Sequence, residues 1–251
     1  MQHDVIILGA TFAAAGFIHG SNKNCLILES RPQAGCEFLG ALNYGTSYDL
    51  PLHSDAAKAL LAEFKKRNVF QGDRICLFDC APLLYAHLAK KQVMLNVQIL
   101  SVEKSETGYT VTTHSVSGYR IYKARHVIDT RTHPHMIASK TFNVLLSGQG
   151  IFSCPNGATF EKWGSDGHYV LKFPVAADED YTQARKNLAQ LTPLLPQSYR
   201  ILLTADTFHY SIQPGYPCKK AGILYMPSAA YANPLAAFDA GVLCAQGGMR
   251  Q

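Results

Sequence analysis

The sequence has few charged residues and no concentrated charge of either sign. Of its 251 residues, 16% are Asp, Glu, Lys or Arg, and 47% are hydrophobic. Charged residues usually make up about 25% of a globular domain, so this composition favours extensive burial, a ligand-filled interior or a subunit interface. The formal net charge is +5, but no run of five like charges occurs. Because nucleic-acid binding usually needs a concentrated basic stripe, we expect no nucleic-acid partner.

A Cys-x-x-Cys pair and a long apolar segment are also missing. Seven cysteines occur, none at that spacing, so neither a zinc ribbon nor a thioredoxin-like redox pair is indicated. Reduced, mostly buried cysteines fit a cytoplasmic protein best. The apolar stretch at residues 5–18 is too short and too glycine-interrupted to span a membrane. We therefore expect a cytoplasmic protein without a membrane partner.

The first thirty residues predict a strand, a helix and a second strand. Residues 4–8 are a nearly continuous apolar run that stops at Gly9, as expected of a strand buried on both faces. Residues 11–20 are small and apolar enough for a packed helix, and residues 25–29 form the next apolar run. This length matches a parallel βαβ unit with a right-handed crossover.

The rest of the chain predicts an α/β fold interrupted by an insertion. Helices are expected over residues 55–67, 81–90 and 178–195, and strands over residues 93–102, 109–114, 120–128, 143–152, 168–174, 200–204 and 222–226. The strands between 93 and 128 suggest an antiparallel meander that returns to the core. We predict a Rossmann-like domain with a parallel central sheet, made of residues 1–45, 70–135 and 218–251. An inserted α+β substrate domain would comprise residues 46–69 and 136–217.

A dinucleotide fingerprint overlaps the βαβ unit. The pattern G-x-G-x-x-A falls on Gly9, Thr11 and Ala14, with Thr11 in place of the second glycine. Glu29 follows Gly9 by twenty residues, a distance at which an acid can accept hydrogen bonds from ribose hydroxyls. A carboxylate there disfavours a 2′-phosphate, which argues against NADP. A Rossmann turn without a ligand is the alternative interpretation.

With these segments, the chain resembles FAD-dependent oxidoreductases of the glutathione-reductase-like, two-dinucleotide-binding fold superfamily. The resemblance covers about half of the chain and is carried by residues 4–29, 31–35, 81–88, 93–102, 124–129 and 222–245. The sequence departs from the family where Arg131 replaces the glycine of Ala-Thr-Gly, and where Pro227-Ser228 replaces Gly-Asp. No second glycine fingerprint follows the first, so the NAD(P)H domain of such reductases has no counterpart.

The resemblance implies FAD as the cofactor and assigns its contacts residue by residue. The strand at Gln98 and Ile99 would meet the adenine, and the helix beginning near Asn233 would point at the flavin. The implied cofactor-binding residues are Gly9, Ala10, Thr11, Phe12, Ala13, Ala14, Glu29, Ser30, Arg31, Gln98, Ile99, Thr130, Arg131, Asn233, Pro234 and Leu235. No metal site is expected, and no catalytic residue can be named.

From the sequence and this resemblance, we predict an FAD-dependent oxidase or dehydrogenase that oxidises a small molecule by hydride transfer to the flavin. Four residues are candidates for contact with that substrate: Tyr44, Tyr48, Arg200 and Tyr210. The main alternative is a non-catalytic, degenerate flavoprotein-fold subunit that binds a partner in a larger complex. An NAD-linked dehydrogenase is a third possibility, which the meander and the returning carboxy-terminal helix disfavour. Either a homo-oligomer or a hetero-oligomeric partner is compatible with the low charge content.

Overall fold

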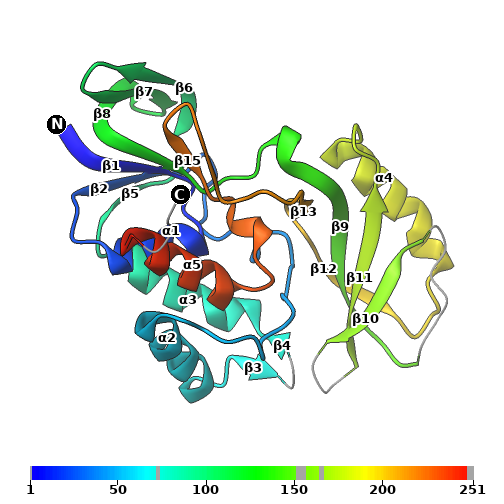
Figure 1. The fold of residues 1–251 in the computed structure, drawn as a ribbon. Helices are drawn as coiled ribbons and strands as arrows, with labels where there is room; N and C mark the ends of the chain where they lie inside the picture. Colours follow the sequence, from blue (N-terminus) through cyan, green and yellow to red (C-terminus); the bar gives the residue numbers. More distant parts are fainter. Residues whose placement is uncertain (1, 72–73, 151–156, 164–166, 248–251) are drawn as a thin grey trace.

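Two sheets organise the molecule, and they stand side by side (Figure 1). A computed structural model describes residues 2–71, 74–150, 157–163 and 167–247. Within them, the larger sheet has eight strands and the smaller has five, with a two-stranded ribbon of β3 (Phe70–Gln71) and β4 (Arg74–Ile75) beside them. The predicted α/β class with a parallel central sheet is confirmed.

The larger sheet is built around β1, which is buried along most of its length. Its path runs β14–β15–β8–β1–β2–β5, and the β14–β15 pair is the antiparallel one on that path. The strands are β1 (Gln2–Leu8), β2 (Cys25–Leu28), β5 (Gln92–Met94), β8 (Gly118–Asp129), β14 (Cys218–Lys220) and β15 (Ile223–Tyr225). Helix α1 (Phe12–Gly20) joins β1 to β2, so the predicted parallel βαβ unit is confirmed.

The predicted meander is also present. Strands β6 (Gln98–Ser105), β7 (Gly108–Ser115) and β8 pair in antiparallel fashion, and the last part of β8 then pairs with β1 in parallel. The single strand expected over residues 93–102 is wrong, because the chain bends between β5 and β6 at Asn96, where φ is +56°. There the backbone N–H groups of Asn96 and Val97 donate to the carbonyls of Arg31 and Glu29.

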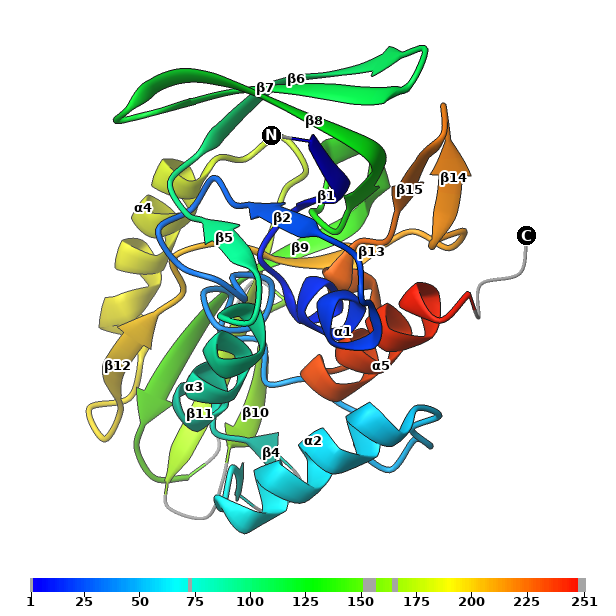
Figure 2. The ribbon, with the colours of Figure 1, turned by 90° about the vertical axis from the view of Figure 1, so that its left-hand side faces the viewer.

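Helices cover the face of the larger sheet opposite the meander (Figure 2). They are α1, α2 (Asp55–Lys66), α3 (Leu77–Leu88) and α5 (Pro234–Ala245). Helix α2 packs against α5, and the backbone N–H groups of His53 and Ser54 donate to the carboxylate of Asp239. This part of the predicted insertion, residues 46–69, therefore lies against the first unit. None of the described helices is long and apolar enough to cross a membrane.

The second unit pairs an antiparallel sheet with one helix. Its strands are β9 (Ile137–Ser147), β10 (Thr159–Trp163), β11 (His168–Val175), β12 (Arg200–Thr204) and β13 (His209–Ile212). Helix α4 (Tyr181–Leu191) is shorter than expected, because its Asp180 cap sets the start and the 3₁₀ turn Thr192–Leu194, containing Pro193, follows its end. β9 starts six residues before the predicted strand, and the end of that prediction, residues 151–152, lies outside the described residues.

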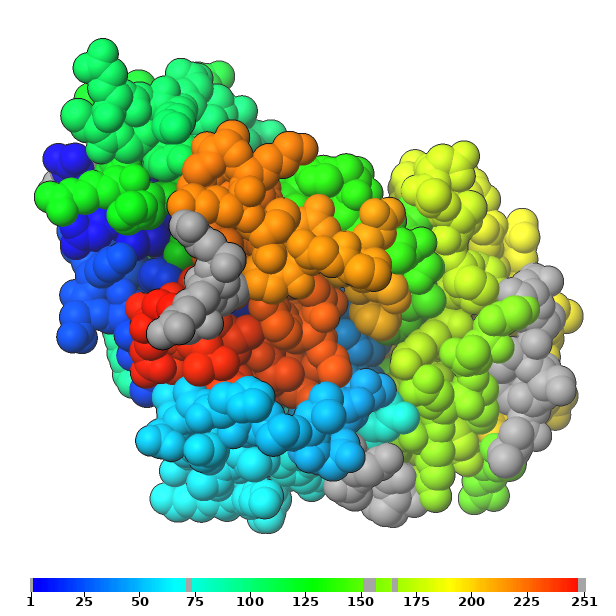
Figure 3. All heavy atoms as spheres, in the orientation of Figure 1, coloured from blue at the N-terminus to red at the C-terminus, as the bar shows by residue number. Residues whose placement is uncertain are grey.

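Buried contacts join the two units, and their surfaces meet in the space-filling view (Figure 3). The side-chain amide of Asn143 on β9 donates to the carbonyl oxygens of Ala41 and Leu42. The indole of Trp163 on β10 donates to the carbonyl of Ile75 and lies 5.0 Å, centroid to centroid, from the ring of Tyr44. Because these polar groups are buried and partnered, they hold the smaller sheet in one position against the larger.

Helices α1 and α5 pack backbone against backbone, which makes Gly16 a sensitive position. A Cβ at Gly16 would overlap the carbonyl of Phe238. We expect Gly16→Ala to lower the free energy of unfolding by about 1–3 kcal/mol, the usual cost of overpacking. Urea unfolding monitored by circular dichroism would measure it. Gly20→Ala in the same helix is the control, because its Cβ would lie 3.0 Å from the Val242 carbonyl oxygen and needs only a small adjustment. Equal losses for both variants would contradict this account.

Candidate functional site

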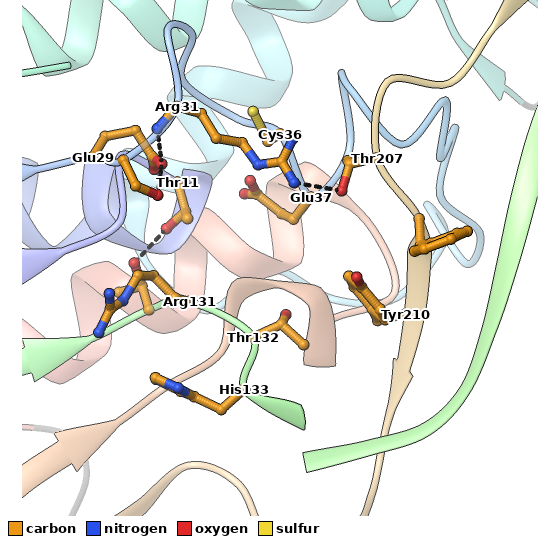
Figure 4. Close-up of a pocket in the computed structure, with 13 residues that line it drawn as sticks. Thr11, Glu29, Arg31, Cys36, Glu37, Arg131, Thr132, His133, Thr207 and Tyr210 are labelled. Carbon is orange, nitrogen blue, oxygen red and sulfur yellow. Dashed lines mark hydrogen bonds between the residues drawn. The ribbon is translucent and has the colours of Figure 1, made fainter. Parts of the chain in front are cut away.

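A cavity of about 310 Å³ lies where the carboxyl ends of β1, β2 and β8 face the second unit (Figure 4). In open α/β sheets, ligands bind in the crevice outside these strand ends. The volume is at the lower end of the range for ligand pockets, about 300–1,000 Å³. The cavity is lined by Thr11, Glu29, Ser30, Arg31, Cys36, Glu37, Thr130, Arg131, Thr132, His133, Thr207, Phe208 and Tyr210.

Gly9 makes the tight turn between β1 and α1. Its φ is +99°, and a Cβ there would lie 2.7 Å from Thr130 Oγ1 and 2.9 Å from Arg131 Cγ. Thr11, the residue in place of the second fingerprint glycine, caps α1: its Oγ1 accepts a hydrogen bond from the Ala14 N–H at 3.1 Å. The same hydroxyl donates to Thr130 Oγ1 at 2.9 Å. The threonine therefore fastens the start of the helix to the end of β8.

Glu29 has its carboxylate held at the edge of the cavity. Oε2 accepts from the Ala10 N–H at 2.9 Å, and Oε1 accepts from the Arg31 N–H at 2.9 Å and the Ser30 hydroxyl at 3.3 Å. The side chain is buried but still lines the cavity. Because a carboxylate has about four acceptor positions, Glu29 can accept a further hydrogen bond from a ligand hydroxyl.

Glu37 lies at the N-terminus of α1. Its Oε1 accepts from the Phe12 N–H at 2.9 Å and from the Ser228 hydroxyl at 2.7 Å, while Ser228 Oγ accepts from the Ala13 N–H at 3.3 Å. Its Oε2 is buried without a hydrogen-bond partner among the described residues. Burial raises the pKa of Glu37 to about 7, although the bonds from Phe12 and Ser228 oppose that shift.

Together, Thr11, Glu37 and Ser228 satisfy the three N–H groups of the first turn of α1. These groups carry the partial positive charge that makes a helix N-terminus an anion site. Sequence reasoning missed Glu37 and Ser228. One signal was available for Glu37: it is the single charged residue between Arg31 and Asp49. Ser228 stands out in the sequence only as a departure from the family's Gly-Asp pair, and no local signal links it to Glu37, 191 residues away.

Asp129, at the end of β8, forms a buried ion pair beside the cavity. Its carboxylate meets the Arg131 guanidinium through two hydrogen bonds, of 2.9 and 2.7 Å, and lies 2.8 Å from His133 Nε2. Burial alone would raise the pKa of Asp129, but hydrogen bonds from Arg131 and His133 outweigh it and hold that pKa below its ordinary value. Arg131 thus neutralises a buried acid.

The wall opposite Glu29 comes from the second unit. Phe208 and Tyr210, just before and on β13, line it, and the Arg31 guanidinium crosses to donate to the Thr207 hydroxyl at 2.9 Å (Figure 4). Burial raises the pKa of Tyr210, while the charge of Arg31 opposes the shift. The cavity therefore has one polar wall, from the dinucleotide turn, and one partly aromatic wall.

The structure brings together only some of the residues proposed from the sequence. Seven of them line the cavity: Thr11, Glu29, Ser30, Arg31, Thr130, Arg131 and Tyr210. Gly9, Ala10, Phe12, Ala13 and Ala14 form the adjoining turn and first turn of α1.

The other candidates lie away from this cavity. Gln98 and Ile99 belong to the meander strand β6, whereas Asn96 and Val97 make the contacts with the backbone next to Glu29.

At the start of α5, Asn233 caps the helix and donates to the Thr46 carbonyl at 2.8 Å, with Pro234 in the first turn. Asn233 and Leu235 line a separate hollow together with Tyr48. Tyr44 is buried against Trp163, and Arg200 stands at the start of β12, paired with Ser147 of β9.

Comparisons with known proteins identify the fold. No protein-family model matches the sequence, and no curated protein matches it either. Solved structures do match, over 98% of this chain. One example is p-nitrophenol 4-monooxygenase from Pseudomonas putida, with a TM-score of 0.59, 14% identity and 78% of that chain covered. A flavoprotein/dehydrogenase from Cytophaga hutchinsonii matches with a TM-score of 0.59, 15% identity and 79% of that chain covered. Glycine oxidase from Geobacillus kaustophilus matches with a TM-score of 0.60, 14% identity and 94% of that chain covered.

These similarities show that the chain has the fold found in flavoproteins of this kind, as the sequence predicted. It spans a smaller share, 61%, of larger neighbours such as AlpK.

The Asp129 ion pair gives a test of the site's stability. Asp129→Asn leaves the partly buried Arg131 without its counter-charge, so we expect a loss of about 3–5 kcal/mol in the free energy of unfolding at pH 7. Because the folded pKa of Asp129 is depressed, its contribution exists above the ordinary pKa of 3.8 and is lost as the pH falls below it. The difference between wild type and variant, measured by denaturant titration, should therefore shrink below about pH 4. A difference that stays constant down to pH 3 would contradict this assignment.

Proposed function

We propose that this protein is an FAD-dependent oxidoreductase that oxidises a small organic molecule in the cytoplasm. One observation carries the proposal: the Gly9 turn, the N-terminus of α1 and the buried carboxylate of Glu29 meet at one cavity between the two units. Helix N-termini attract phosphate, and an acid after the second strand binds ribose hydroxyls. The shared fold with structures named as a monooxygenase, a flavoprotein/dehydrogenase and a glycine oxidase supports the same class.

The residues of the cavity fit the ribose and pyrophosphate of FAD, on one condition. Glu29 retains acceptor capacity for ribose hydroxyls, and Arg31 brings a guanidinium group that would balance phosphate charge, whereas the charge of Arg131 is already balanced by Asp129. The condition concerns Glu37, because its Oε1 accepts from the Phe12 N–H where a phosphate oxygen would bind. As a carboxylate it would repel the pyrophosphate. As a neutral acid it becomes a donor that can bond to a phosphate oxygen.

The chain would supply position and electrostatics for the reaction. The redox chemistry itself, acceptance of a hydride from the substrate, would belong to FAD when bound. Phe208 and Tyr210 would shield the reacting atoms from water on the side of the second unit, and Arg31 would bridge the two walls through Thr207. We assign neither a substrate nor a general base; hydride transfer from a neutral amine, for example, leaves an iminium ion and needs no base.

A direct test of the proposal is flavin binding by the purified protein. After incubation with FAD and gel filtration, we expect the protein to retain flavin, seen as an absorption band at about 450 nm, where oxidised flavins absorb. Glu29→Gln should weaken FAD binding by about tenfold or more, because charge-assisted hydrogen bonds to the ribose are lost. Glu106→Gln, an exposed acid in the meander turn, is the matched control. No retained flavin at any pH between 5 and 8 would exclude the proposal.

The Glu37 condition predicts a pH dependence. If FAD binds only when Glu37 is protonated, its Kd should rise by about tenfold per unit above pH 7. Glu37→Gln, which is always neutral, should bind FAD tightly at pH 8 and abolish the slope. Fluorescence titration at several pH values measures both. An equal slope in wild type and Glu37→Gln would show that another group titrates.

The same residue should be visible in the stability of the ligand-free protein. The folded pKa of Glu37, about 7, lies above its ordinary value of 4.5. Its stabilising contribution is therefore complete below pH 4.5 and is lost as the pH rises through 7. Relative to Glu37→Gln, wild type should lose up to about 3 kcal/mol between pH 5 and pH 8 in denaturant titrations. Parallel stability curves for the two proteins would contradict a buried, titrating Glu37.

One observation favours the second candidate, a non-catalytic subunit with a flavoprotein fold. All three N–H groups in the first turn of α1 already have side-chain partners. In such a subunit, Glu37 would replace the pyrophosphate permanently. The flavin-retention experiment separates the two functions. If neither wild type nor Glu37→Gln retains FAD, the non-catalytic subunit becomes the better proposal, and its partner in an assembly should be sought.

A further inference from the structure

A second cavity, of about 500 Å³, lies on the helix-covered side of the larger sheet, away from the first cavity. Its walls come from the sheet strands β1, β8 and β15, from α1 and the end of α5, and from the β14–β15 hairpin. In Figure 3 this hairpin (orange) stands above the end of α5 (red). The cavity exists because α1 and α5 cover the centre of the sheet and leave the part toward β15 less covered.

The strand register places apolar side chains along the floor of this cavity and one lysine at its edge. Lys219 pairs with Leu224, and Leu224 pairs with Ile128, so these three side chains share one face of the sheet. In the same way, Val5 pairs with His126. All five residues line the cavity. Lys220 pairs with Ile223, and successive residues of a strand point to opposite faces, so Lys220 faces the meander side.

The opening is positively charged. Lys23, from the α1–β2 connection, and Lys219 both line the cavity and are exposed. His126 lines the same cavity. Burial is the main reason its pKa is lowered, and the charges of Lys23, Lys219 and Arg125 lower it further, while Asp4 acts in the opposite direction. Among the described residues, no Asp or Glu lines the cavity. An anion at the opening would therefore relieve repulsion between these groups.

We propose that this second cavity binds a small amphipathic carboxylic acid, with its apolar body on Pro217, Leu224 and Cys244, which keep accessible surface, and its carboxylate between Lys23 and Lys219. The volume suits a small molecule, since ligand pockets measure about 300–1,000 Å³ and are mostly apolar with a few polar groups that orient the ligand. The complementary charge selects an acid over an amine or an alcohol. This site shares no lining residue with the first cavity, so the proposal is independent of flavin binding.

Octanoate is a suitable probe, and octylamine has the same apolar chain with the opposite charge. By isothermal titration calorimetry, we expect octanoate to bind and octylamine to bind at least tenfold more weakly. Lys219→Gln and Lys23→Gln should each weaken octanoate binding by about three- to fivefold, as expected for partly exposed ion pairs. Lys220→Gln should leave it unchanged. Equal binding of octylamine, or an equal effect of Lys220→Gln and Lys219→Gln, would overturn the proposal.

Cysteine alkylation locates the bound acid without relying on the lysine variants. Cys244 lines the second cavity and Cys36 lines the first. In iodoacetamide labelling followed by peptide mass spectrometry, octanoate should slow the alkylation of Cys244 and leave that of Cys36 unchanged. Burial raises the pKa of the Cys244 thiol to about 11, so labelling is best done at mildly alkaline pH. Protection of Cys36 alone, or of neither cysteine, would overturn the assignment of the acid to this cavity.

Discussion

The first turn of α1 is the constraint on which the arrangement of the site depends. Its free N–H groups must be satisfied, and the three side chains that do so come from three distant parts of the chain: Thr11 from the glycine turn, Glu37 from the following loop and Ser228 from the segment before α5. Each of these hydrogen bonds fixes the position of the segment that carries the side chain next to the helix N-terminus. The loop that carries Cys36 and the end of the larger sheet are therefore held around one cavity, and Glu29 is fixed beside it.

The parts of the fold that could be predicted from sequence are those in which neighbouring residues determine the structure. The apolar runs around Ile7 and Ile27 are typical of buried strands, and a short helix between two strands favours a parallel pair, as observed. The meander could be predicted too, because apolar and polar residues alternate along its strands. The break at Asn96 could not be foreseen, because it arises from backbone hydrogen bonds to Glu29 and Arg31, more than sixty residues earlier. Likewise, the early start of β9 reflects its central place in a sheet whose other strands follow it in the chain.

The same distinction between local and distant contacts separates the site residues that could be predicted from those that could not. Glu29 was found because a βαβ unit fixes the distance from the turn to the second strand end, and Thr11 because it stands in the fingerprint. Glu37 and Ser228 act through contacts that only the folded chain creates. Tyr44 and Arg200 were proposed from their side-chain chemistry, and the structure places both away from this cavity: Tyr44 packs on Trp163 and Arg200 begins an edge strand. Side-chain chemistry suggested candidates, while tertiary packing decided which of them face the cavity.

The close approach of α1 and α5 has a consequence for the order of folding. Gly16 lies against the backbone of Phe238, and Gly241 lies against that of Ala13, so each helix completes the packing surface of the other. More than two hundred residues separate them. During synthesis at the ribosome, the amino-terminal βαβ unit therefore cannot complete its packing until α5 has been synthesised. Contacts of such high sequence separation slow folding, and until they form the apolar face of α1 is incompletely covered.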